Sequence, residues 1–386
     1  MPAARLKSGR GGPMKPGHLS YETVPHPRMN TPATPAQASV DDHIRSVAGL
    51  SGRMLGELRQ SLRRIEEINR TTLVISMNAR VESARMGAAG RGFAVIAQEM
   101  DALSRRVAET AGEIDRRAEA TRADMQATLA RLEDEVRHTR LAGLALVNID
   151  LIDRNLYERS CDVRWWATDA AVVAAARPGA TAEELAHASR RMGQILDSYT
   201  VYFDLVLVGL DGCVLANGRP GQYRSAGMDV RDAPWFESAR RCASGEEFGF
   251  QEVHASALAG GERVLVYACG VREGGRVDGR LLGVLGIVFR WDALAQTVVQ
   301  RTPLSQQEWT RSRACIVDGQ VRVLADSAGR ILQEVIDFPG RDELLRQPLA
   351  ARVVEFQGRP HCVAHAASPG YETYRSGWHS LILQAL

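Results

Sequence analysis

The clearest pattern along the chain is a spacing of apolar and small residues by alternating steps of three and four. One such run lies between residues 44 and 75 and a second between residues 97 and 132, with charged residues filling the positions between. This spacing places one stripe along a helix and is typical of coiled-coil seams. The segment between the runs, residues 78–92, contains three glycines. We therefore predict an antiparallel hairpin of two helices over residues 41–142.

An isolated hairpin would leave much of its apolar stripe in water. Each arm of about 40 residues is about 60 Å long at 1.5 Å per residue. Two hairpins would bury both stripes in a four-helix bundle, so we expect a homodimer. Residues 1–40 are rich in Pro, Gly, Ser, Thr and basic residues and have no helical or strand period, which predicts a disordered tail.

Beyond residue 143 the helical pattern gives way to strands. Thr181 can act as the N-cap of a helix, with Glu184 three residues later, and Asp211-Gly212 is a hairpin-turn signal between two apolar runs. Helices are predicted over 144–177, 181–199 and 234–242, and strands over 203–210, 213–216, 262–269, 281–289, 352–356, 360–366 and 379–384. A strand-turn-strand is predicted over 314–327. The prediction is an α+β protein whose hairpin precedes a first lobe (143–300) and a smaller second lobe (301–386).

Composition narrows the class of protein. The net charge of +2 and 24% charged residues give no signal for a nucleic-acid partner. The six cysteines are scattered without a CxxC pair, so neither a disulfide framework nor a zinc site is expected. No stretch approaches the roughly 18–20 apolar residues that span a bilayer, and the N-terminus lacks the apolar core of a secretory signal. The expectation is a soluble, cytoplasmic protein.

No motif for catalysis is found. The chain contains no P-loop, GxSxG, HExxH or kinase signature. His361 and His365 are four apart, a spacing that binds zinc on a helix. The local pattern predicts a strand, however, which would separate them by about 13 Å. We therefore expect no enzyme activity, no metal and no cofactor.

The segment between the two helical runs carries a longer motif. Residues 71–100 read TTLVISMNARVESARMGAAGRGFAVIAQEM. This stretch resembles the hairpin tip of methyl-accepting chemotaxis proteins and contains the family's run GRGFAV unchanged. In that family the tip contacts the chemotaxis histidine kinase and its coupling protein. The resemblance implies partner-binding roles for six residues: Asn78, Glu82, Arg85, Arg91, Phe93 and Val95.

Four positions of this stretch depart from the family pattern. The family's Gln and Asn are replaced by Thr71 and Leu73, an Ala by Arg80, and the Glu before the turn by Ala88. These changes fall where contacts with the kinase would lie. Two functions therefore stay open: a transducer that signals through the tip, or a non-catalytic scaffold whose degenerate hairpin only dimerises.

The rest of the chain resembles a double Cache sensor domain, a pair of PAS-like sheets that follow a long N-terminal helix. Residues 227–239 read GMDVRDAPWFESA and are similar to a Cache element. Residues 264–270 and 283–289 resemble its later strands, and 314–329 and 370–378 resemble a second lobe. The resemblance implies a small-molecule site, for which five residues are candidates: Asp229, Arg231, Trp235, Phe236 and Tyr267.

The identity of the small molecule is narrowed by three positions. Double Cache domains that bind amino acids carry an Arg, a Tyr and an Asp where this chain has Ala233, Phe236 and Val288. A ligand carboxylate would lose its bidentate guanidinium partner, so an α-amino acid is disfavoured. For Trp235 and Phe236, packing between helix and sheet is the alternative role.

Overall fold

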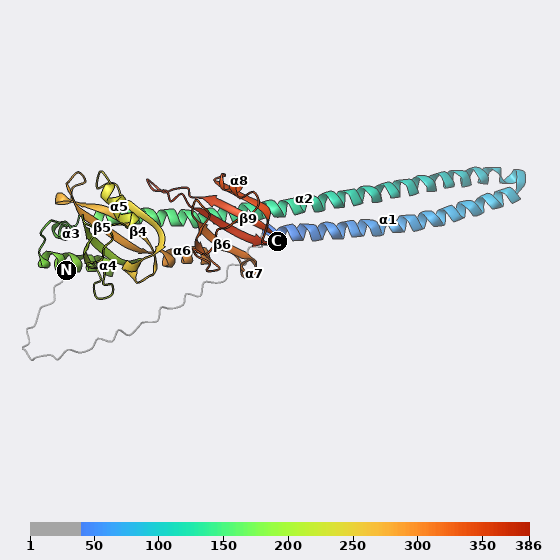
Figure 1. The fold of residues 1–386 in the computed structure, drawn as a ribbon. Coiled ribbons are helices and arrows are strands. Elements are labelled where there is room, and N and C mark those ends of the chain that lie inside the picture. The colour runs from blue at the N-terminus through green and yellow to red at the C-terminus, as the bar shows by residue number, and fades with distance from the viewer. Residues whose placement is uncertain (1–39) are drawn as a thin grey trace, which may run out of the picture.

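The computed structural model describes residues 40–386, and the tail predicted for residues 1–40 falls outside them apart from its last residue. The molecule is a long two-helix hairpin followed by two lobes arranged along the same axis (Figure 1). We call residues 167–290 the first lobe and residues 291–386 the second lobe. The second lobe lies next to the base of the hairpin and the first lobe lies beyond it (Figure 1).

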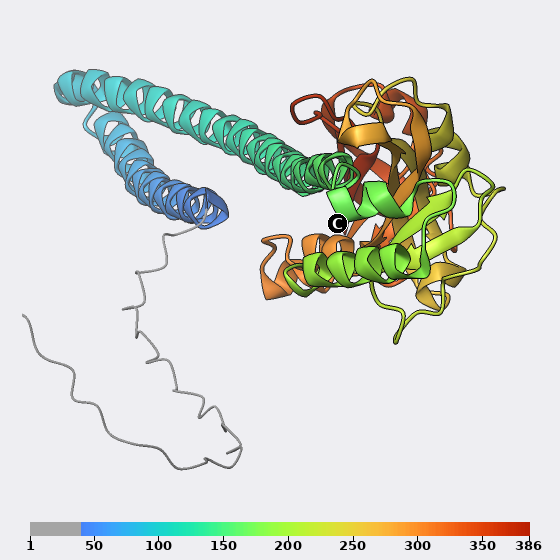
Figure 2. The ribbon, with the colours of Figure 1, turned by 90° about the vertical axis from the view of Figure 1, so that its left-hand side faces the viewer.

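The hairpin is built from α1 (Val40–Arg85), a short 3-10 turn (Gly87–Gly90) and α2 (Arg91–Trp166). At 1.5 Å per residue, the 76 residues of α2 span about 114 Å. The prediction of a separate helix over 144–177 was wrong, because α2 continues through Gly143 and ends at Trp166. Figure 2 shows α2 entering the lobes while α1 ends outside them.

Packing explains why α2 does not break at its glycine. A helical Gly costs about 1 kcal/mol relative to Ala. Burying one Leu, Ile or Val side chain contributes about 1.5–3 kcal/mol. Five such residues of α2 are fully buried in the lobes, Leu141, Ile149, Ile152, Leu156 and Val163, together with the smaller Ala145. The free energy gained by burying these side chains is therefore several times larger than the cost of Gly143 in the helix.

The two arms of the hairpin approach each other through small and polar residues spaced seven apart. Ser76 Oγ donates to the carbonyl oxygen of Ala97 at 2.7 Å, and Asn69 Nδ2 donates to that of Ser104 at 2.8 Å. The buried residues of this contact are Leu62, Ser76 and Ser83 on α1, Gly90 in the 3-10 turn, and Ala97, Ser104, Ala111 and Ala118 on α2. The larger apolar residues of the α1 stripe are exposed in this single hairpin, as expected for an isolated pair of arms: Val47, Met54, Leu58, Ile65, Ile68 and Ile75.

The first lobe is a five-stranded antiparallel sheet with helices around it, and its strand order is β2-β1-β5-β4-β3. The predicted capping box of Thr181 and Glu184 is confirmed at the start of its second helix, and Gly212 (φ 84°) closes the predicted hairpin turn. Its elements are α3 (Ala170–Ala175), α4 (Ala182–Asp197), β1 (Tyr202–Gly209), β2 (Val214–Asn217), α5 (Pro234–Arg241), β3 (Gly249–Ala255), β4 (Arg263–Arg272) and β5 (Leu281–Arg290), with 3-10 turns at Ala257–Ala259 and Glu273–Gly275.

The second lobe repeats the same relative strand order, β7-β6-β10-β9-β8. Its elements are α6 (Trp291–Gln300), α7 (Gln306–Trp309), β6 (Ser312–Val317), β7 (Val323–Asp326), α8 (Arg341–Leu345), β8 (Leu349–Phe356), β9 (Arg359–Ala367) and β10 (His379–Ala385). The predicted α+β class, with a helical hairpin followed by antiparallel lobes, is confirmed. Strand β3 was missed by the sequence prediction.

Both sheets share one core with α2. Leu205 and Tyr267 of the first sheet and Ala364 of the second belong to the same buried cluster as Ile149 and Leu156 of α2. The opposite face of each sheet has a separate core. Alternation along each strand assigns successive side chains to these two faces. Both sheets therefore pack directly against α2.

Candidate functional sites in the hairpin tip and the lobes

The hairpin tip is closed by glycines at two positions. Gly87 has φ 55°, which L-residues rarely adopt. Gly90 lies against the backbone of Ser83, so a Cβ at this position would collide with the Ser83 carbonyl oxygen. Gly92 has no atom near its missing Cβ. The glycines of the tip are thus not equivalent, and Gly90 is the one that sets how closely the arms meet.

All six predicted tip residues are exposed at the end of the hairpin: Asn78, Glu82, Arg85, Arg91, Phe93 and Val95. Glu82 and Arg85 form an ion pair at 3.5 Å. Phe93 is 61% exposed, and Met77 and Val81 near the end of the other arm are also exposed. Exposed apolar residues that form a contiguous patch are typical of interaction sites.

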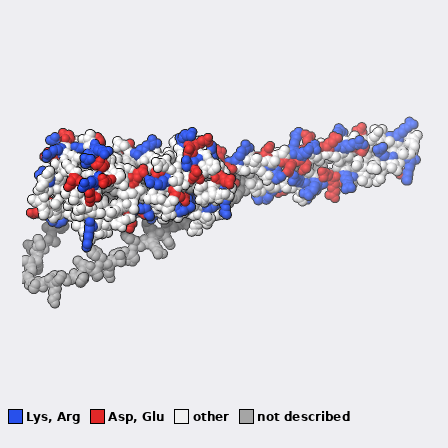
Figure 3. All heavy atoms as spheres, viewed as in Figure 1, with Lys and Arg blue, Asp and Glu red and all other residues white. Residues whose placement is uncertain are grey.

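The tip is also basic. Arg80, Arg85 and Arg91 are exposed there, with Glu82 as their acidic neighbour, and basic side chains stand at the end of the hairpin in Figure 3. Arg80 is one of the departures from the family pattern, and the structure places it on the exposed surface of the tip. The tip therefore presents both apolar side chains and positive charge.

The first lobe places Trp235 and Phe236 in its core. Both lie on α5, are 2% and 1% exposed, and pack on the face of the sheet that is turned away from α2. Gly286 of β5 leaves room for the indole, since a Cβ there would be 2.9 Å from Trp235 Cζ3. Trp235 and Phe236 thus pack between helix α5 and the sheet, which was the predicted alternative to a ligand-binding role.

Tyr267 lies on the other face of the same sheet. Its hydroxyl is 2.7 Å from that of Tyr374 in the second lobe, and burial raises the pKa of Tyr267 well above its usual range. Tyr267 therefore does not share a pocket with Trp235. The sequence analysis grouped Tyr267 with Trp235, but Val266 occupies the position on β4 that faces α5.

Asp229 and Arg231 stand at the rim of the first lobe. Arg231 Nε donates to Asp229 Oδ2 at 2.8 Å, and both side chains are more than half exposed. The Arg231 guanidinium holds the pKa of Asp229 below its ordinary value. Beside this pair lies a cleft of about 400 Å³ between residues 228–235 and 251–258.

The cleft contains residues that the sequence analysis did not select. Gln251 and His254 come from strand β3, and Ser256 follows it. Gln251 Oε1 is buried without a hydrogen-bond partner among the described residues. Such an acceptor costs free energy unless a donor reaches it. No sequence signal identified these residues, because β3 itself was not recognised.

A buried carboxylate connects α2 to the second lobe. Asp153 is fully buried and accepts hydrogen bonds from Ser368 Oγ (2.5 Å), Gly370 N–H (2.8 Å), Ser376 N–H (3.3 Å) and Ser376 Oγ (2.5 Å). All four donors belong to the loop between β9 and β10. We call this arrangement the Asp153 clasp. An acidic residue on the apolar face set by Ile149, Ile152 and Leu156 is the sequence signal that could have found it.

The histidine spacing noted in the sequence leads to a different pair. His361 and His365 lie on β9, as the strand prediction required. His365 instead pairs with His379 of the neighbouring strand, with Nε2 and Nδ1 2.8 Å apart. Burial, followed by the nearby His379, lowers the pKa of His365 to about 4. No group of three or more His, Cys, Asp or Glu side chains suited to a metal occurs within residues 40–386.

Comparison with known families bears on the hairpin first. Residues 28–151 match the family described as methyl-accepting chemotaxis protein (MCP) signalling domain. The hairpin is therefore similar to this family, and the match covers about a third of the chain. The methyl-accepting chemotaxis protein PcaY of Pseudomonas putida is 31% identical over 139 residues, 34% of this chain and 25% of PcaY. Chemoreceptor McpA of Caulobacter vibrioides is 52% identical over 54 residues, 14% of this chain and 8% of McpA. The chain thus spans about a quarter or less of these chemoreceptors.

The lobes are similar to solved sensor domains of chemoreceptors. The ligand-binding domain of Pseudomonas fluorescens CtaA in complex with L-leucine has 16% identity and a TM-score of 0.45, covering 64% of this chain and 94% of that one. The sensory domain of Campylobacter jejuni Tlp3 with isoleucine has 14% identity and a TM-score of 0.48, covering 64% and 91%. Within this chain, the two lobes share one strand order, β2-β1-β5-β4-β3 and β7-β6-β10-β9-β8. In the described part of the chain, no helix has the length and apolarity needed to cross a bilayer.

Proposed function

We propose that this protein is a non-enzymatic signal transducer. A small molecule bound by the lobes changes the position of α2, and the hairpin tip presents that change to the chemotaxis histidine kinase and its coupling protein. The observation that carries the proposal is the continuity of α2, which supplies Arg91 and Phe93 at the tip and Asp153 and Trp166 in the lobes. Sensor and output share one helix with no linker between them.

The first-lobe cleft is the proposed sensory site. The unpartnered Gln251 Oε1 requires a hydrogen-bond donor, and Asp229 and Asp232 line the same cleft. These acceptors favour a ligand that donates N–H groups. Ala233 also lines the cleft, at the position where an amino-acid carboxylate would need an arginine. The proposed ligand class is therefore a small amine or amide without an α-carboxylate.

A homodimer is part of the proposal. An apolar groove of about 450 Å³ runs between the hairpin arms, lined by Leu62, Ile65, Leu103, Arg106, Val107, Thr110, Ala111 and Ile114. Along α2, apolar residues recur every eleventh position: Leu103, Ile114, Met125, Val136 and Val147. An eleven-residue repeat keeps one stripe on a nearly straight helix. A second copy lying parallel would cover this stripe. Light scattering that finds only monomer at tens of micromolar would contradict this arrangement.

The tip is tested with a matched pair of arginines. Arg85 pairs with Glu82 at the tip, and Arg105 pairs with Asp101 on the arm. Both are exposed, so Arg85→Ala and Arg105→Ala should each change stability by less than about 0.5 kcal/mol. In a reconstituted assay with kinase and coupling protein, only Arg85→Ala is expected to abolish binding and the change in autophosphorylation.

The scaffold function is the alternative outcome of the same assay. Leu73, Arg80 and Ala88 are the residues that favour it, because they alter the tip where kinase contacts would lie. A wild-type chain that dimerises but neither binds the kinase nor alters its activity would support the scaffold and refute the transducer. Loss of binding in both arginine variants would show that the contact is not at the tip.

A further inference from the structure

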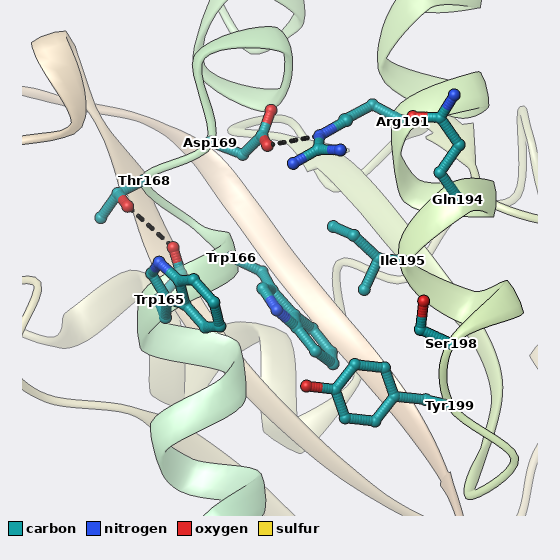
Figure 4. Close-up of a pocket in the computed structure, with 9 residues that line it drawn as sticks. All are labelled: Trp165, Trp166, Thr168, Asp169, Arg191, Gln194, Ile195, Ser198 and Tyr199. Atoms are coloured by element: carbon teal, nitrogen blue, oxygen red, sulfur yellow. Dashed lines mark hydrogen bonds and ion pairs between the residues drawn. The ribbon is translucent and has the colours of Figure 1, made fainter. Parts of the chain in front are cut away.

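A second, separate groove lies at the end of α2 farthest from the tip. It has a volume of about 270 Å³ and opens between the last turn of α2 and helix α4 (Figure 4). It shares no residue with the first-lobe cleft. Its lining residues are Trp165, Trp166, Thr168, Asp169, Arg191, Gln194, Ile195, Ser198 and Tyr199.

Three aromatic side chains shape the groove. Trp165 is 69% exposed, which is unusual because tryptophan side chains are on average highly buried. Trp166 is buried and packs edge-to-face against Tyr199 with ring centroids 5.1 Å apart. In Figure 4, Trp165 and Tyr199 stand on opposite sides with Trp166 between them. Flat walls of this kind suit a planar ring, which gains from stacked or edge-on contacts.

The polar end of the groove carries an available cation. Both oxygens of Asp169 are occupied: Oδ1 accepts from Ala171 N–H at 3.0 Å, and Oδ2 accepts from Arg191 Nε at 2.9 Å. Arg191 makes no other hydrogen bond within the described chain, and Figure 4 places its guanidinium above Ile195 and Trp166. The two terminal nitrogens of Arg191 are therefore left to bind an anion, for which a carboxylate has the matching bidentate geometry.

We propose that this groove binds a planar aromatic carboxylate of one or two rings. The ring lies among Trp165, Trp166 and Tyr199, and the carboxylate accepts hydrogen bonds from Arg191. A cationic ligand is disfavoured because the one carboxylate that lines the groove, Asp169, is already paired with Arg191. Clefts that bind small molecules usually have volumes of about 300–1,000 Å³. The groove, at about 270 Å³, lies just below this range and therefore suits a ligand of one or two rings.

Binding here would join the end of α2 to α4, because the ring touches Trp165 and Trp166 of α2 and the carboxylate binds Arg191 of α4. Passage of that effect to the hairpin tip rests on the proposed function. Binding itself does not, so it is measured directly on the full chain and without any kinase.

Isothermal titration calorimetry of the full chain with benzoate and 2-naphthoate tests the site. Both are expected to bind, whereas benzylamine, with the same ring and a cation, and cyclohexanecarboxylate, with the same anion and no flat ring, are not. Arg191→Gln and Trp165→Ala should each weaken binding by about tenfold or more. Arg190→Gln, an exposed neighbour on α4 that does not line the groove, should leave it unchanged.

Four results would overturn the proposal. They are absence of binding by both aromatic carboxylates at millimolar concentration, equal binding of benzylamine, unchanged binding by Arg191→Gln, and loss of binding in Gln251→Ala with retention in Trp165→Ala. The last result would place the ligand in the first-lobe cleft. If neither carboxylate binds and Trp165→Ala lowers the oligomeric state in light scattering, Trp165 is a contact between copies and the ligand site is refuted.

Discussion

Replacing Asp153 by asparagine separates the charge of the clasp from its shape. Asparagine offers one acceptor oxygen where aspartate has two, and its amide N–H groups would face donors. The hydroxyls of Ser368 and Ser376 can rotate to accept from the amide, but the backbone N–H that faces the amide nitrogen, of Gly370 or of Ser376, cannot. A buried N–H without an acceptor costs about 1–3 kcal/mol. We expect Asp153→Asn to lower the free energy of unfolding by about 2 kcal/mol, and Asp153→Ala, which strands two backbone N–H groups, by about 4 kcal/mol.

Urea unfolding followed by circular dichroism measures this difference. Asp150→Asn is the matched control, because Asp150 lies one turn earlier on α2 and forms an ion pair with Arg154 at 2.8 Å near the surface. Its effect should stay within about 0.5 kcal/mol. Hydrogen exchange should also accelerate at the amides of residues 368–378 in Asp153→Asn only. An Asp153→Asn variant as stable as the control, or faster exchange spread evenly over the chain, would refute the reasoning.

Three further variants probe the tip, the second lobe and the first lobe. Gly90→Ala should disrupt the tip and lower helicity or melting temperature, whereas Gly92→Ala, with open space at its Cβ, should be neutral or slightly stabilising. His365 has a folded-state pKa of about 4, below its unfolded value of about 6.5. The unfolded chain therefore binds more protons between these values, and stability that is complete above pH 6.5 falls by about 2 kcal/mol at pH 5. Urea unfolding at pH 7 and 5 should show a smaller loss for His365→Gln, and an identical loss would contradict this. Gly286→Ala should cost about 1–3 kcal/mol by pushing the Trp235 ring, and an unchanged tryptophan emission would argue against this contact.

The sequence predicted the hairpin and the lobes because both depend on local periodicity. It did not predict that α2 would pass through Gly143, because continuity there depends on burial against two sheets that are distant in sequence. It placed small residues such as Ala97 and larger ones such as Ile65 on the same stripes, without showing which of them meet within one hairpin. In the structure Ser76 and Ala97 form the contact between the arms, since close approach of two helices favours short side chains.

The candidate sites divide along the same line. The exposed position of the tip residues could be predicted because the motif is contiguous and surrounds the turn. The first-lobe set mixed Trp235 with Tyr267, which face opposite sides of one sheet. Because side chains alternate along β4, Val266 and Tyr267 must lie on opposite faces of the sheet. The sequence alone does not show which of these faces packs against α5. Gln251 was missed because its strand has weak alternation and lies at the edge of the sheet.

The unbroken length of α2 fixes a rotational phase between sensor and tip. Each residue of an α-helix advances by about 100°, since 3.6 residues complete one turn. One residue inserted near position 140 would swing the tip by that angle relative to the lobes, whereas seven residues would return it to within about 20°. An insertion that lengthens α2 and keeps the tip facing the same way must therefore add a nearly whole number of turns.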